Sequence, residues 1–148
     1  MYEHIMIAVD KTPNKGAVVD HAAKLAKLSG AVLHVVHVTP LHLVPEDVVA
    51  GSRFGVVSGD GDVDPREQNL VADLLTELRS AGVTATGEVV NATEHDTARV
   101  ISERAKENRA ELLILGESHH RGPSRLFKAS VAADIVHHSL PCPVLLIP

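Results

Sequence analysis

Short apolar runs rich in β-branched residues alternate along this chain with segments whose apolar residues recur at helical spacing. The strands predicted from these runs are Ile5–Val9, Leu33–Val38, Val83–Val90, Leu112–Leu115 and Val144–Ile147. The helices predicted between them are Lys15–Ser29, Pro65–Ser80, Glu94–Arg109 and a segment that follows Ser130. Regular alternation of this kind is typical of a parallel sheet with helices on both faces, so the sequence predicts a three-layer α/β/α fold with a five-stranded parallel sheet.

Turn and capping residues support the predicted ends of the first two helices. Gly30 and Gly82 follow these helices directly, at the position where glycine commonly adopts the left-handed backbone that ends a helix. Asp64 precedes the second helix and Glu67 stands three residues further on, a spacing typical of a capping box. Both helices are therefore expected to be short and well delimited.

Length and composition fit one domain over residues 1–148, with residues 39–64 as a long flexible loop. A chain of 148 residues can bury a self-sufficient core. Hydrophobic residues make up 45% of the chain and aromatic residues only 2%, so small and β-branched aliphatic side chains must fill the interior. Four glycines and two prolines within residues 39–64 break the alternation and favour a loop, with a short helix over residues 46–50 as the alternative.

Charge and hydropathy exclude several classes of protein. The formal net charge is −5 and no cluster of lysine and arginine appears, which argues against nucleic acid as the main partner. No apolar run approaches the ~18 residues of a membrane span, and the first residues do not form a basic segment followed by an apolar one. Cys142 is the single cysteine, which fits a cytosolic protein without disulfides. We therefore expect a cytoplasmic protein that binds neither nucleic acid nor membrane.

The loop after the fourth predicted strand suits a bound anion. Gly116 ends the strand and Ser130 opens the next helix, where free backbone N–H groups and a partial positive charge favour a phosphate. Residues 116–130 resemble the nucleotide loop of the universal stress protein family, Gly-x2-Gly-x9-Gly-Ser/Thr, and match it at Gly116 and Ser130. The opening residues Ile5–Asp10 and the closing residues Pro141–Ile147 are similar to the ends of that family, so the resemblance covers essentially the whole chain.

The resemblance implies a fold, a ligand and a partner. It implies a Rossmann-like fold of the adenine nucleotide alpha hydrolase type with strand order 3-2-1-4-5. It also implies a regulator of the stress response that binds ATP or another adenine nucleotide, with Mg²⁺ as a candidate ion bound to the nucleotide. It also implies a homodimer joined through the strand Val144–Ile147. The ligand-binding residues that it implies are Ala8, Val9, Asp10, Val38, Leu115, Gly116, His119, Arg121, Gly122, Ala129, Ser130 and Val131. Among these, Asp10 would lie near the adenosine, and Ala8 and Val38 would line the adenine.

Two departures from the loop pattern open an alternative. The second glycine of the pattern falls on His119 and the third on Ala129. A side chain at position 119 takes space that glycine leaves free, and glycine also allows a positive φ that histidine disfavours, so one hypothesis is a dimeric interaction module that binds no nucleotide. The contrary hypothesis is that His119, His120 or Arg121 reaches the phosphates and replaces the missing backbone contact.

Catalytic and metal sites lack their usual residues. No Ser/His/Asp set stands at a known spacing, and neither the phosphate loop Gly-x4-Gly-Lys-Ser/Thr nor a dinucleotide glycine pattern follows the first strand. We therefore expect no catalytic residues and at most slow ATP hydrolysis. The pairs His119-His120 and His137-His138 are expected to be solvated, because adjacent side chains point apart. His34 and His37 have opposite parity in the second strand, so at least one is expected to be buried or to face the ligand cleft.

Overall fold

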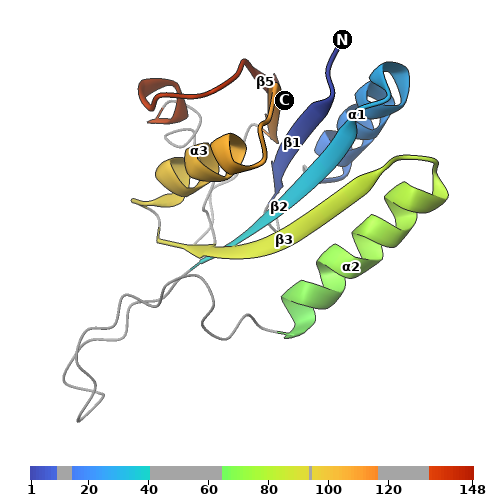
Figure 1. Cartoon of the computed structure of the whole chain (residues 1–148). Helices are drawn as coiled ribbons and strands as arrows, with labels where there is room; N and C mark the ends of the chain where they lie inside the picture. The colour runs from blue at the N-terminus through green and yellow to red at the C-terminus, as the bar shows by residue number, and fades with distance from the viewer. Residues whose placement is uncertain (10–14, 41–64, 94, 117–133) are drawn as a thin grey trace.

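The computed structural model of the chain describes residues 1–9, 15–40, 65–93, 95–116 and 134–148 (Figure 1). Its strands are β1 (His4–Val9), β2 (Val32–Pro40), β3 (Ala85–Ala92), β4 (Leu112–Gly116) and β5 (Val144–Ile147). Its helices are α1 (Lys15–Ser29), α2 (Pro65–Ser80) and α3 (Thr97–Glu107), and residues 134–137 add one helical turn. The predicted alternation of strands and helices is confirmed over these residues.

The strands form one sheet in the order β3-β2-β1-β4-β5, and every neighbouring pair is parallel. β1 lies at the centre, where Ile7 stands opposite Val35 in β2 and Ile114 in β4. The predicted strand order 3-2-1-4-5 is therefore confirmed. The chain first builds outward from β1 to β3 and then crosses back to start β4 on the other side of β1.

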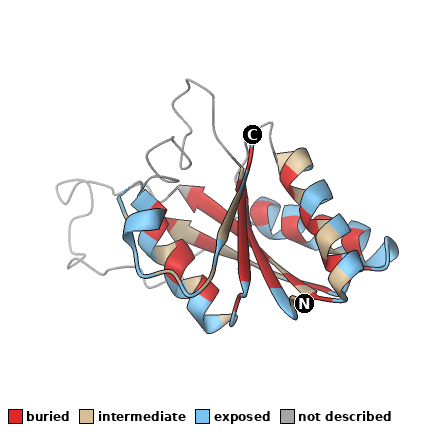
Figure 2. Cartoon of the chain, turned by 90° about the horizontal axis from the view of Figure 1, so that it is seen from above, coloured by how far each residue is buried: buried red, intermediate tan, exposed pale blue. Residues whose placement is uncertain are grey.

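Helices cover both faces of the sheet, so the core is divided into two halves (Figures 1 and 2). α1 and α2 cover one face, where buried residues such as Ala22 and Leu74 pack on Ile7. α3 and the turn at residues 134–137 cover the other face, where Ile101 and Ile135 are fully buried. Figure 2 shows the resulting red central sheet with pale outer helix surfaces. The three-layer α/β/α architecture is confirmed.

Glycine ends α1 and α2 as the sequence predicts. Gly30 and Gly82 both adopt a positive φ, of 74° and 82°. After Gly82 the backbone N–H of Val83 donates to the carbonyl of Leu78 at 3.0 Å, which satisfies a carbonyl that the helix leaves open. Only a residue without a Cβ adopts this backbone without a steric cost.

The third strand lies two residues further along the chain than predicted. It spans Ala85–Ala92 instead of Val83–Val90. The N–H of Val83 is engaged in closing α2, which delays the strand. At the other end of β3, Asn91 and Ala92 pair with Thr39 and Pro40. Thr39 and Pro40 therefore belong to β2, whereas the sequence predicts a loop from residue 39. The remainder of that loop lies outside the residues that the structure describes.

The third helix is shorter than the predicted span Glu94–Arg109. It begins at Thr97, because Thr93 and Asp96 form a turn in which the Asp96 N–H donates to the Thr93 carbonyl at 3.1 Å. It ends at Glu107, and Arg109 has a positive φ of 51° that interrupts the helical backbone.

None of the helices that the structure describes combines the length and the apolar character that a membrane span requires.

A glycine in β3 sets how closely α2 approaches the sheet, and we predict that Gly87→Ala lowers the free energy of unfolding by about 1–3 kcal/mol. A Cβ built on Gly87 would lie 3.0 Å from Cγ1 of Val71 and 3.1 Å from the carbonyl oxygen of Val35. The control is Gly16→Ala at the start of α1, where no atom lies within 4 Å of the added Cβ. Because alanine favours a helix, this variant should gain about 0.5–1 kcal/mol. Urea denaturation measures both, and equal stability of the two variants would contradict the packing described here.

Candidate functional site

The carboxyl ends of β1 and β4 lie side by side at the point where the strand order reverses. Ala8 pairs with Leu115, so the next residues, Val9 and Gly116, end neighbouring strands. The next described helical segments, α1 and residues 134–137, cover opposite faces of the sheet, and in open parallel sheets ligands bind where the strand order reverses in this way. This edge, between β1 and β4, is the candidate site.

Five of the residues implied by the resemblance meet at this edge. They are Ala8, Val9, Val38, Leu115 and Gly116. Ala8, Val38 and Leu115 belong to the core cluster under α3, whereas Val9 faces α1 and α2. Gly116 is half-buried and is the most exposed of the five. The five residues thus lie together, and their role in binding a ligand stays a prediction.

The remaining implied residues lie outside the described part of the chain. They are Asp10, His119, Arg121, Gly122, Ala129, Ser130 and Val131. The roles of these residues stay predictions. The first residues of the helix predicted after Ser130, and Asp64 as the N-cap of the second helix, also lie outside the described residues and stay predictions.

The described part of the edge is apolar and closely packed. Ala8, Val38 and Leu115 lie on the same face of the sheet and are almost fully buried. Gly116, without a side chain, leaves the backbone open to a close approach.

A buried histidine and a buried glutamate form a pair on the other face of the sheet. Nε2 of His37 lies 2.6 Å from Oε2 of Glu67, and both side chains are almost fully buried. His37 directly precedes Val38, so the pair joins the first turn of α2 to the end of β2. The expectation that one of the two strand histidines is buried is confirmed, and His37 is on the face opposite to Val38.

Glu67, which the sequence predicts as part of a capping box, is bonded instead to His37, a contact that the sequence does not predict. A signal was present, because Glu67 continues the stripe of buried residues Val71, Leu74 and Leu78 on α2. A carboxylate on the apolar face of a helix requires a buried partner. The partner stands 30 positions away in the chain.

Polar groups gather where β2 and β3 end and α3 begins. The hydroxyl of Thr39 donates to the side-chain oxygen of Asn91 on the neighbouring strand. The Thr93 hydroxyl donates to Asp96 at 2.8 Å, and this bond, with the nearby Arg99 guanidinium, holds the pKa of Asp96 below its ordinary value. Asp96 is therefore ionised at neutral pH.

Among the described residues, no group of three or more histidine, cysteine, aspartate or glutamate side chains is placed to hold a metal ion. Cys142 is half-buried, and desolvation raises the pKa of its thiol. A thiol with a raised pKa is mostly protonated at neutral pH and is a poor nucleophile.

Comparison with known proteins gives one family over the whole chain. The model of the universal stress protein family matches residues 1–148. The chain is also 28% identical over 150 residues to universal stress protein A homolog 1 of Coxiella burnetii, covering 97% of this chain and 94% of that relative.

Solved structures of this family have the same fold. A universal stress family protein from Burkholderia pseudomallei superposes with a TM-score of 0.69 at 23% identity, over 99% of this chain and 96% of that one. The universal stress protein of Archaeoglobus fulgidus in complex with dAMP superposes with a TM-score of 0.65 at 20% identity, over 99% and 98%. At these identities the likeness shows the fold.

We predict that Glu67→Ala lowers the free energy of unfolding by about 3 kcal/mol, because it leaves His37 buried without its carboxylate. The control is Glu77→Ala, an exposed position on the same helix, which should change stability by less than about 0.5 kcal/mol. Guanidinium denaturation followed by circular dichroism measures both. An equal, small effect of the two substitutions would contradict a structural role of the pair.

Proposed function

Since the chain belongs to the universal stress protein family, we propose that it binds an adenine nucleotide at the candidate site and regulates the stress response through its nucleotide occupancy. The observation that carries the proposal is the meeting of Ala8, Val38 and Gly116 where β1 and β4 end. A relative of the same fold has been solved in complex with dAMP, an adenine nucleotide.

Each part of the site has a distinct chemical task in this proposal. Ala8 and Val38 contact the adenine, which they bind through apolar surface. The carboxylate of Asp10 accepts a hydrogen bond from the sugar hydroxyls or the base. Gly116 and Ser130 bind the phosphates through backbone N–H groups and a hydroxyl. ATP, ADP and AMP all carry these features, and Mg²⁺ would accompany a triphosphate.

In this proposal, residues of the loop 117–133 balance the negative charge of the phosphates. Asp96 adds a negative charge between β3 and α3, and the nearby Arg99 pairs with Asp96 and Glu103. His119 and Arg121 of the loop supply donors in place of the backbone contact that glycine would give.

An interaction module without nucleotide is the second candidate, and a specific observation supports it. The family pattern has glycine where this chain has His119 and Ala129. If the imidazole of His119 blocks the phosphates, the same fold acts by docking partners alone.

The proposal includes a cytoplasmic homodimer joined through β5. β5 is the last strand of the sheet and pairs with β4 on one side. Leu146 of β5 is 43% exposed, which is unusual for a large apolar side chain in a strand. Edge strands of this kind are commonly protected by pairing with a second copy.

We predict that isothermal titration calorimetry detects binding of at least one of ATP, ADP and AMP. Asp10→Ala should weaken that binding at least tenfold, about 1.4 kcal/mol, because a charged acceptor is lost. His119→Gly separates the two hypotheses on the loop. Tighter binding indicates a steric block by the imidazole, and weaker binding indicates direct contact with the phosphates.

Asp20→Ala, on the exposed face of α1, is the matched control and should leave the affinity unchanged. If no nucleotide binds the wild type or His119→Gly, nucleotide regulation is wrong and the interaction module is favoured.

We also predict that Leu146→Lys converts the dimer to a monomer. The substitution replaces an apolar side chain of the joined strands with a charge that is costly to bury. Leu28→Lys is the control, since Leu28 is 86% exposed on α1, away from β5. Light scattering at micromolar concentration measures the mass of each variant. A monomeric wild type, or dimers in both variants, would contradict the interface.

A further inference from the structure

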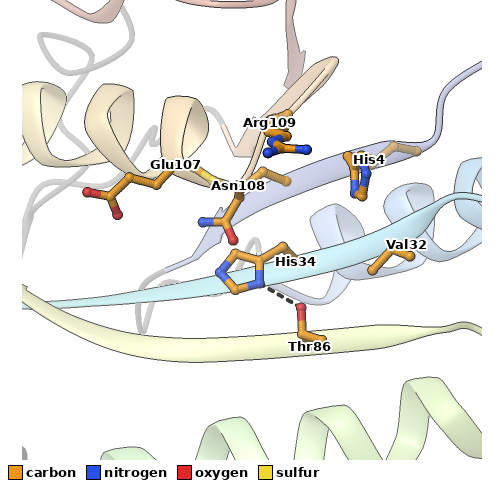
Figure 3. Close-up of a pocket in the computed structure, with 10 residues that line it drawn as sticks. His4, Val32, His34, Thr86, Glu107, Asn108 and Arg109 are labelled. Atoms are coloured by element: carbon orange, nitrogen blue, oxygen red, sulfur yellow. Dashed lines mark hydrogen bonds between the residues drawn. The ribbon is translucent and has the colours of Figure 1, made fainter.

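A second cleft lies at the opposite, amino end of the sheet, on the face that α3 covers (Figure 3). Its volume is about 280 Å³. The polar groups that line it come from four elements: His4 at the start of β1, His34 of β2, Thr86 of β3, and Glu107, Asn108 and Arg109 at the end of α3. Nothing in the proposed nucleotide site uses these residues, because that site lies where the strands end.

Arg109, which lines this cleft, has an unusual backbone conformation. α1, α2 and α3 all end in the same way, with a left-handed residue followed by an N–H that bonds back into the helix. In α1 and α2 that residue is glycine, whereas in α3 it is Arg109 with a φ of 51°. An arginine in this conformation carries a steric cost that glycine avoids. Backbone strain of this kind is common where a side chain has a function.

The two carboxylates near the cleft share another arginine. Arg104 lies 2.8 Å from Glu107 and 3.7 Å from Glu88. Glu88 also accepts from Nε2 of His34 at 3.1 Å, and this bond holds the pKa of Glu88 below its ordinary value. Both carboxylates therefore already have partners other than Arg109.

Arg109 is left with a free charge at the mouth of the cleft. Within the described ranges, no carboxylate lies within ion-pair distance of its guanidinium, which Figure 3 shows above His34 and Asn108 and beside His4. The other nearby acid, Glu111, accepts the backbone N–H groups of Glu3 and His4.

The ring of His34 is held in a fixed orientation on the floor of the cleft. Its Nδ1 lies 2.7 Å from the Thr86 hydroxyl and its Nε2 lies against Glu88. Apart from Glu107, which pairs with Arg104, the rest of the lining is apolar and includes the buried Met6 and Ala110. A free guanidinium over a small, partly apolar hollow matches a compact ligand with an oxyanion.

We propose that this cleft is a second binding site, for a small metabolite that carries a carboxylate or phosphate group, with the Arg109 guanidinium as its main contact. A cleft volume of about 280 Å³ favours a compact ligand. Arginine is retained at the end of α3, against the backbone preference for glycine, because its side chain binds the ligand. The fold thus carries two separate sites at opposite ends of one sheet.

Titrations of the full chain with succinate and with inorganic phosphate test the proposal, with sodium chloride at matched ionic strength as the reference. Amide chemical shifts should move at His4, His34 and residues 108–110 with one or both probes. Binding of succinate alone indicates carboxylate ligands, and binding of phosphate alone indicates phosphorylated ones. Shifts that sodium chloride reproduces would overturn the proposal.

The substitution Arg109→Gly separates binding from folding. It should weaken the probe at least tenfold while the melting temperature stays equal or rises, because the strained backbone is relieved. Arg109→Asn, which tolerates the same backbone, should also lose binding. Arg99→Ala, on an exposed position of the same helix, should bind as the wild type does. Unchanged affinity in both Arg109 variants would overturn the proposal.

Discussion

The reversal of strand order between β1 and β4 is the constraint on which the rest of the structure depends. β1, β2 and β3 are laid down outward on one side, with α1 and α2 on one face, and α3 then returns over the other face to start β4. Because right-handed crossovers dictate the face of each helix, the strand order reverses between β1 and β4, and ligands of open parallel sheets bind at such a reversal. The candidate site follows from this topology and not from any single residue.

The fold was predictable from the sequence because its signals are local. Apolar runs give the strands, helical spacing gives the helices, and Gly30 and Gly82 mark two helix ends that the structure confirms. The errors occur where two elements compete for one backbone group. The N–H of Val83 bonds into α2 and delays β3, and the turn at Thr93 and Asp96 delays α3. Periodicity along the chain carries no information about such competition.

The candidate site was predictable only in part. The resemblance identified Ala8, Val38 and Gly116 as neighbours, and strand register brings them together. The pairs that support the two ends of the sheet were not found, because they join residues distant in sequence: Glu67 is 30 positions from His37, and Glu88 is 54 from His34. Arg109 escaped notice because the helical pattern continues through it, and only its backbone angle reveals that the helix has ended.

The central claim is that an adenine nucleotide binds where β1 and β4 end. Amide chemical shifts of the labelled chain, followed during titration with AMP, test it most directly, because they report every part of the sheet at once. The account predicts that the largest changes at saturation fall on Ala8, Val38 and Gly116, with little change at His4 and Val32 at the other end. Changes centred on that amino end, or none at millimolar AMP, would contradict it.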